Sequence, residues 1–165
     1  MPNWCSNNAT FTHKDPAMIQ RVVDAYNADR LLSEFLPCPI DPEKDSHLDW
    51  HSWRANNWGT KWDVSSVDEV TADGNSVTVY FDSAWNPPIE FYRWMEEELN
   101  FEIRAYYWEP GMGFCGIYQR GDDDSYEVGH RDSAWVMENI PKSLDDMFSI
   151  SASMEVWEED NGNAS

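Results

Sequence analysis

The chain has 165 residues, enough for one domain of ordinary size and too few for two. Apolar residues make up 41% and charged residues 25%, which favours a folded protein over global disorder. No apolar run reaches the roughly 18 to 20 residues of a membrane-spanning helix, and the amino terminus lacks the basic and apolar blocks of a secretory signal. We therefore expect a soluble, intracellular protein.

The net charge is −20, from 31 acidic residues against 11 Lys and Arg. Such a charge repels phosphate backbones and anionic membranes, so it nearly excludes direct duplex binding and disfavours membrane binding. It favours a basic partner: a cation, a Lys/Arg-rich protein or the nucleic-acid groove of another protein. The alternative is solubility alone or adaptation to high salt, since only 4 of the 11 bases are Lys.

Residues 3–13 alternate between polar and apolar types and predict a strand. Asp15 and Pro16 are typical of a helix start, and apolar residues three and four apart predict a helix over about 16–29. Residues 31–40 are apolar, but their two prolines argue against a helix or a central strand, so an extended crossing is expected.

Residues 41–61 are polar and Trp-rich and show no clear period, which predicts a long loop of the kind that is often functional. His47 and His51 in this loop are four residues apart, a spacing that zinc accepts on a helix with a third ligand such as Asp45 or Asp49. Because helical periodicity and the HExxH glutamate are absent, two surface histidines are the default. No metal or cofactor is expected.

Strands are predicted for 62–70 and 77–81, with Asp73–Gly74 as a hairpin turn. A second helix is predicted over 88–99, with its three consecutive glutamates, 96–98, in solvent. The remaining predicted strands are 101–108, 115–119 and a short one near 125–128, after a polar break at 121–124.

The resulting order, β-α-β-β-α-β, is that of the α+β ferredoxin-like split βαβ fold: an antiparallel sheet with two helices on one face. We expect this domain over residues 1–120, followed by a C-terminal hairpin and an acidic extension over 121–165. The extension holds 12 acidic and 2 basic residues, a net −10. We expect a short helix packed on the body with a turn at Pro141, an edge strand at 154–157 and disorder over 158–165.

The three cysteines, Cys5, Cys38 and Cys115, are far apart and include no CxxC pair. Without a secretion signal they are expected to be reduced thiols in strands or loops. Motifs for nucleotide hydrolysis, dinucleotide binding and serine hydrolysis are absent, so no catalytic residue is predicted.

Three motifs are distinctive: MPNWC at 1–5, NWGTKWD at 57–63 and SAWNPP at 83–88. On these motifs the chain resembles the YubB-like proteins of plasmids and bacteriophages, whose second part is a ferredoxin-like domain. The resemblance covers residues 1–120, with Asn86 where Ser is more usual and no counterpart for the acidic region. It implies the same fold, an origin in a mobile element and the cytoplasm of a bacterial host, and it carries no activity or catalytic residues.

In such a sheet the tryptophans of these motifs would gather near one end. One interpretation is an aromatic cluster that pins the long loop to the sheet. The other is a pocket in which an indole stacks on a flat ligand, or more weakly on single-stranded nucleic acid, which the net charge opposes. The candidate ligand-binding residues are Arg54, Asn57, Trp58, Lys61 and Trp85.

The leading prediction is a non-enzymatic accessory protein that binds a basic protein through an acidic face, in its most specific form a nucleic-acid mimic that blocks a host nucleic-acid-binding protein. The candidate contacts are Asp122, Asp123, Asp124, Glu155, Glu158, Glu159 and Asp160. The competing hypotheses are a small-molecule binder or enzyme that uses the Trp-rich loop, and a structural module without a ligand. The sequence identifies neither the partner nor the oligomeric state.

Overall fold

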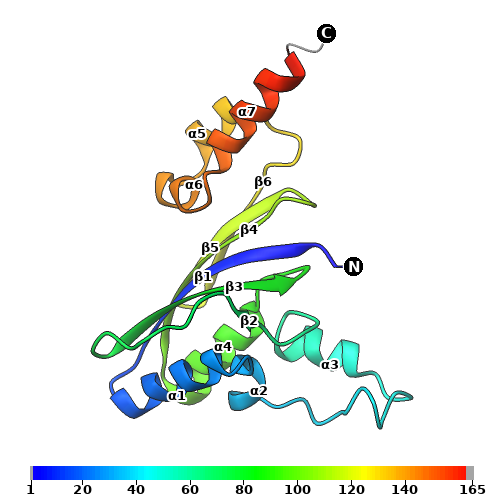
Figure 1. The fold of residues 1–165 in the computed structure, drawn as a ribbon, viewed down its shortest axis with the longest axis vertical. Coiled ribbons are helices and arrows are strands. Elements are labelled where there is room, and N and C mark those ends of the chain that lie inside the picture. Colours follow the sequence, from blue (N-terminus) through cyan, green and yellow to red (C-terminus); the bar gives the residue numbers. More distant parts are fainter. Residues whose placement is uncertain (1, 163–165) are drawn as a thin grey trace.

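In the computed structural model, which describes residues 2–162, a six-stranded antiparallel sheet carries helices on both faces (Figure 1). The strand order is β2-β3-β1-β4-β5-β6. Its first four strands have the ferredoxin-like order, which confirms the predicted fold: β1 (Trp4–Thr12), β2 (Ser65–Ser66), β3 (Ser76–Ala84) and β4 (Glu102–Glu109). The predicted hairpin, β5 (Phe114–Gln119) and β6 (Asp122–Glu127), extends the sheet beyond β4.

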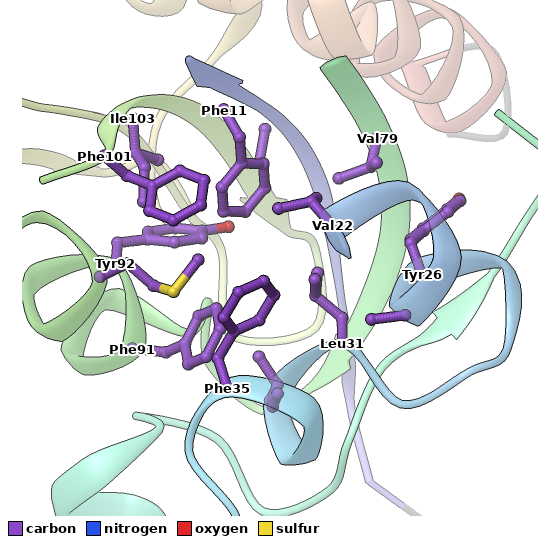
Figure 2. Close-up of a cluster of buried hydrophobic side chains, with 14 of the residues drawn as sticks. Phe11, Val22, Tyr26, Leu31, Phe35, Val79, Phe91, Tyr92, Phe101 and Ile103 are labelled. Atoms are coloured by element: carbon purple, nitrogen blue, oxygen red, sulfur yellow. The ribbon is translucent and has the colours of Figure 1, made fainter. Parts of the chain in front are cut away.

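The helices of the two split βαβ units, α1 (Pro16–Asn27) and α4 (Ile89–Leu99), cover one face of the sheet (Figure 1). The Asp15 carboxylate accepts a hydrogen bond of 2.9 Å from the Ala17 amide and so caps the N-terminus of α1, as predicted. Figure 2 shows the main core beneath these helices, where the ring of Phe11 meets those of Tyr92 and Phe101 edge to face.

The expected extended crossing after α1 is wrong in its first half, because residues 31–35 form a short helix, α2 (Leu31–Phe35). Its amide groups at Leu32 and Ser33 donate to the two carboxylate oxygens of Asp63, at 2.9 and 3.0 Å. The helix ends before Pro37, so the prolines only terminate it. Because the capping residue, Asp63, is 31 residues away from Leu32, the sequence around α2 contains no capping signal that would predict this helix.

The predicted long loop contains another helix, α3 (Trp50–Asn57), whose N-terminal cap is Asp49: its carboxylate accepts a hydrogen bond from the Ser52 amide. None of its residues is fully buried, so it lacks the apolar stripe that would have revealed it. The strand predicted over 62–70 is reduced to β2, and the side chain of Asn27 instead bonds both backbone polar groups of Val70. The turn at Asp73–Gly74 is as predicted, with Gly74 at φ +61°.

The C-terminal extension forms three helices on the other face of the sheet: α5 (Ser133–Asn139), α6 (Lys142–Phe148) and α7 (Ile150–Gly162) (Figure 1). They enclose a second, smaller core that includes Cys115 of β5 and Leu144 of α6. The predicted edge strand at 154–157 is therefore wrong, and so is the expected disorder over 158–162. Residues 163–165 lie outside the described residues.

Side-chain caps explain the helical course of the extension. The Asp145 carboxylate accepts hydrogen bonds from the amide and hydroxyl of Ser151, at 2.7 and 2.6 Å, in the first turn of α7. Ser149 between α6 and α7 takes a left-handed φ of +52° and separates the two helices.

Across residues 2–162, no helix is both long and apolar enough to cross a membrane.

The polar break predicted over 121–124 is wrong for residues 122–124, because β6 already begins at Asp122. The turn is made by Arg120 and Gly121, which both have positive φ, +51° and +85°. This is the backbone of a two-residue hairpin turn that matches the twist of the strands.

Candidate functional site

The three distinctive motifs meet at one end of the sheet, as the sequence predicted. Trp4 pairs with Ala84, and the amide of Trp85 donates to the carbonyl of Asn3 at 2.8 Å. The hydroxyl of Thr60 donates to the carbonyl of Ala84, also at 2.8 Å. Gly59, at φ +85°, brings the middle motif so close to the start of α4 that a Cβ would lie 3.1 Å from the amide nitrogen of Ile89.

Trp58 of the middle motif is part of the main core. Its side chain is 1% exposed, and its indole N–H donates to the carbonyl of Leu36 at 2.8 Å. The side-chain amide of Asn57 donates back to the carbonyl of Trp53 within α3. Neither face of the Trp58 indole is open to a ligand, so this residue pins the loop to the body of the domain.

Arg54 lies among three indoles. Its guanidinium carbon is 4.8 Å from the ring centre of Trp50, 4.9 Å from Trp58 and 5.6 Å from Trp62. One of its terminal nitrogens donates to the carbonyl of Lys61 at 3.1 Å. Four of the five predicted ligand residues (Arg54, Asn57, Trp58 and Lys61) therefore fall in one neighbourhood, where their contacts are with the protein itself.

Trp85, the fifth predicted residue, faces a separate hollow of about 600 Å³. It is 42% exposed. The hollow lies between the SAWNPP motif and the segments on either side of the β5–β6 hairpin. It is lined by Trp85, Asn86, Met112, Gly113, Phe114, Glu127, Gly129, His130 and Arg131.

The backbone at Trp85 is strained. Its φ is +68°, and the amide of Asn86 donates to the carbonyl of Ala84 at 2.8 Å, which closes a γ-turn around Trp85. A bulky residue in such a conformation costs about 1–3 kcal/mol and persists only where its surroundings hold it. Here they do so through the carbonyl of Asn3 and the hydroxyl of Ser83, which donates to the carbonyl of Asn86 at 2.7 Å.

A second hollow of about 410 Å³ adjoins the first and has Asn86, Phe114 and Glu127 in common with it, and the two hollows together are called the groove below. Its wall includes Tyr107, whose hydroxyl donates to Asp123 at 2.6 Å. The second hollow is therefore lined by acidic groups that include Asp123, whereas His130 and Arg131 line the first.

The acidic candidates on β6 alternate between the two faces of the sheet. Asp123 lines the second hollow, whereas Asp122 and Asp124 line a hollow that includes Tyr126 and Pro141. Since β6 is the last strand of the sheet, these charges also protect its free edge against pairing with another chain.

The acidic candidates on α7 have different roles. Glu158 accepts hydrogen bonds from the amide and hydroxyl of Ser133, at 2.9 and 2.7 Å, and so joins α7 to the start of α5. Glu155, Glu159 and Asp160 are exposed.

Two apolar side chains stand beside these acids on α7. Val156 is 60% exposed and Trp157 is 66% exposed. The sequence reasoning missed this surface because it assigned 154–157 to a strand. The spacing of Ile150, Met154 and Glu158, four residues apart, could have indicated a helix that turns these three inward.

Metal and thiol chemistry find no support in the part of the chain that the structure describes. Residues 2–162 contain no group of three or more His, Cys, Asp or Glu side chains placed to hold a metal ion. His47 and His51 are exposed, and only His51 is on α3. Burial raises the pKa of the Cys115 thiol to about 12 and that of Cys5 further, so both are protonated at neutral pH.

The comparisons with known proteins concern the same region. A family model described as the ferredoxin-like domain in Api92-like protein matches residues 57–148, over half of the chain. The chain belongs to this family. The matched range contains two of the three motifs, Trp85 and the whole β5–β6 hairpin. This description mentions neither plasmids nor phages, so the narrower resemblance to plasmid and phage proteins rests on the motifs alone.

A crystal structure of the protein Api92 from Yersinia pseudotuberculosis is also similar to this chain. The match covers 78% of this chain and 99% of that one, with 15% sequence identity and a TM-score of 0.44. The search of curated proteins found no match.

Proposed function

We propose that this chain is a non-enzymatic binding protein that engages a basic partner protein through the exposed face of α7. The observation that carries the proposal is the pair Val156 and Trp157, 60% and 66% exposed, set among the acidic residues of that helix. Single exposed apolar residues are ordinary, but an exposed tryptophan beside an exposed valine on one helix gives a partner an unusually large apolar area to bury.

The way α7 is held supports a docking role. Its inner positions, Ile150, Met154 and Glu158, face the rest of the bundle, and Glu158 is bonded to Ser133. The other face of the helix is left for a partner. An exposed Trp on a pre-formed helix suits insertion into an apolar groove, because such side chains supply much of the binding energy in protein interfaces.

The charge of α7 selects the class of partner. Glu155, Glu159 and Asp160 form no ion pair within residues 2–162. A partner with Lys and Arg around an apolar groove would satisfy both the acids and the indole. Complementary charge would also speed association and make it sensitive to salt.

We further propose, on the resemblance of the three motifs alone, that the chain comes from a phage or plasmid and meets its partner in the bacterial cytoplasm. A host nucleic-acid-binding protein is the most specific candidate, because its binding groove is basic. In that case the chain would act as a nucleic-acid mimic.

The test is affinity capture from bacterial lysate with the tagged full chain at low and moderate salt, followed by binding measurements with the purified captured protein. We expect a basic protein that moderate salt releases. Displacement by duplex DNA would establish mimicry, whereas retention in excess duplex would place the contact on another basic surface.

Matched variants decide whether α7 makes the contact. Trp157→Ala and the pair Glu159→Gln with Asp160→Asn should each weaken binding at least about tenfold, as expected for an anchor residue and its flanking charges. The controls are Val67→Ser, which alters an apolar side chain with 61% exposure outside α7, and the pair Glu97→Gln with Glu98→Gln on α4. Binding that survives the α7 variants, or capture of no basic protein, would refute the proposal.

A further inference from the structure

The hollow beside Trp85 carries an inference that is independent of α7. We infer that it is a binding site for a small aromatic carboxylate, whose ring stacks on the indole of Trp85 and whose carboxylate pairs with the guanidinium of Arg131. Both side chains line the same hollow, and its volume of about 600 Å³ is in the range of small-molecule sites.

Among the described residues, Arg131 is a cation without a carboxylate within ion-pair distance, in a chain of net charge −20. Six basic side chains within residues 2–162 form ion pairs, and Arg131 is not among them. Its guanidinium instead lies over the ring of Trp135, with 4.5 Å between the guanidinium carbon and the ring centre. Stacking of this kind orients the guanidinium plane and leaves its N–H groups free for an anion.

Trp85 provides the apolar surface for the ring. Its backbone is held on both sides, because its own amide donates to the carbonyl of Asn3 and the amide of Asn86 donates to that of Ala84. The indole is nevertheless 42% exposed. A tryptophan that is held in a strained γ-turn and still faces a hollow is a pre-organised stacking surface.

Two glycines let the segment that leads to Arg131 pack closely against the turn before β5. A Cβ on Gly113 would lie 2.4 Å from the Cα of Gly129, so these two backbones are in direct contact. The amides of Val128 and Gly129 both donate to the carbonyl of Gly113, at 2.7 and 3.0 Å. The segment that leads to Arg131 is thereby attached to the turn between β4 and β5.

The charges around the hollow favour a carboxylate over a phosphate. Arg131 offers one planar fork, which can pair with two oxygens of either anion, so the neighbouring groups decide between them. Glu127 lines the same hollow and opposes a doubly charged anion. His130 adds a single ring nitrogen donor rather than the set of bases or backbone amides typical of a phosphate site.

The test uses indole-3-carboxylate as the probe, with indole-3-carboxamide and inorganic phosphate for comparison. Binding to the full chain is followed by NMR through the Trp85 indole N–H and the Arg131 Nε–H resonances. We expect the carboxylate to shift both resonances, the carboxamide to bind at least about tenfold more weakly, since it cannot form the charged pair, and phosphate to leave both unchanged.

The variants separate the two contacts. Arg131→Gln should lower carboxylate affinity at least about tenfold and leave carboxamide affinity nearly unchanged. Arg131→Lys should recover only part of the loss, because it keeps the charge without the planar fork. Trp85→Asn, which tolerates the left-handed backbone, should remove binding of both indoles.

The matched control is Arg104→Gln, because Arg104 is also stacked on an aromatic ring, 5.1 Å from the centre of Tyr106, and does not line this hollow. The amide spectrum of each variant checks that it is folded. The inference is overturned if the unmodified chain does not bind the carboxylate, if Arg131→Gln binds it equally well, or if phosphate competes for the site as strongly.

Discussion

The hydroxyl of Tyr107 on β4 reaches across β5 and donates a hydrogen bond of 2.6 Å to Asp123 on β6. It can do so because the intervening residue is Gly116, where a Cβ would lie 2.3 Å from the Tyr107 hydroxyl oxygen. The contact ties the edge strand to the third strand inward and forms part of the groove wall. Gly116 is thus required because the Tyr107 side chain of the neighbouring strand occupies the place of a Cβ, and not because of its own backbone conformation.

Gly116→Ala should destabilise the fold by about 2–4 kcal/mol, because the added methyl group overlaps the buried phenol and strand pairing prevents either from moving away. Chemical denaturation followed by circular dichroism measures the loss. Tyr107→Leu in the same background shortens the obstructing side chain and should restore part of the stability. If Gly116→Ala unfolds at the same denaturant concentration as the original chain, the close approach of Tyr107 is not real.

Glu158→Ala should release the second half of α7 from the bundle. The carboxylate holds both the amide and the hydroxyl of Ser133, and its removal leaves these groups without partners, at a cost of about 1–3 kcal/mol. Hydrogen exchange should show faster exchange in the last two turns of α7 and unchanged protection in the central strand β1. Glu159→Ala removes a charge of the same sign one residue away and is the control. Equal exchange in both variants would contradict the assigned role of Glu158.

Three of the seven tyrosines should titrate late. Burial raises the pKa of Tyr92, Tyr107 and Tyr118 well above the ordinary value of 10, and the phenols of Tyr107 and Tyr118 also donate to the carboxylates of Asp123 and Glu96. The folded state thus holds these protons more tightly than the unfolded state. The stability this provides is fully present below pH 10 and is lost as pH rises above it.

The measurement is a tyrosinate absorbance titration of the folded and the denaturant-unfolded chain. In the folded chain we expect three phenols to ionise only together with unfolding, whereas all seven titrate near pH 10 in denaturant. Tyr118→Phe should reduce the late group to two. A folded chain whose tyrosines all ionise before circular dichroism changes would contradict the buried donor roles.

Local signals account for the parts of the fold that were predicted correctly. The first helix follows from Asp15, Pro16 and an apolar stripe, all within its own sequence. The turn at Gly74 likewise depends on the residues of the turn itself. By contrast, α2 is capped by Asp63 and the end of α7 is held by Ser133, so these elements depend on residues far away in the sequence.

The candidate site divides in the same way. That the three motifs meet at one end of the sheet followed from strand order, which the periodicities already contained. The difference in burial between Trp58 and Trp85 could not be predicted from strand order, because both are tryptophans in polar, turn-rich segments. Trp58 is packed into the main core, where the carbonyl of Leu36 accepts its indole N–H, whereas Trp85 lies in a γ-turn and lines a hollow.

The ferredoxin-like sheet, its two packing helices and the acidity of the C-terminal extension could all be predicted without a structure, because composition and short-range periodicity encode them directly. Which tryptophans, acids and arginines remain accessible to a partner or ligand depends on long-range packing and could not be predicted in this way. The exposure of a side chain depends on what packs against it. Trp85 and Arg131 line their hollow together with residues from other parts of the chain. Trp157 is exposed on α7, a helix that the local sequence pattern did not predict.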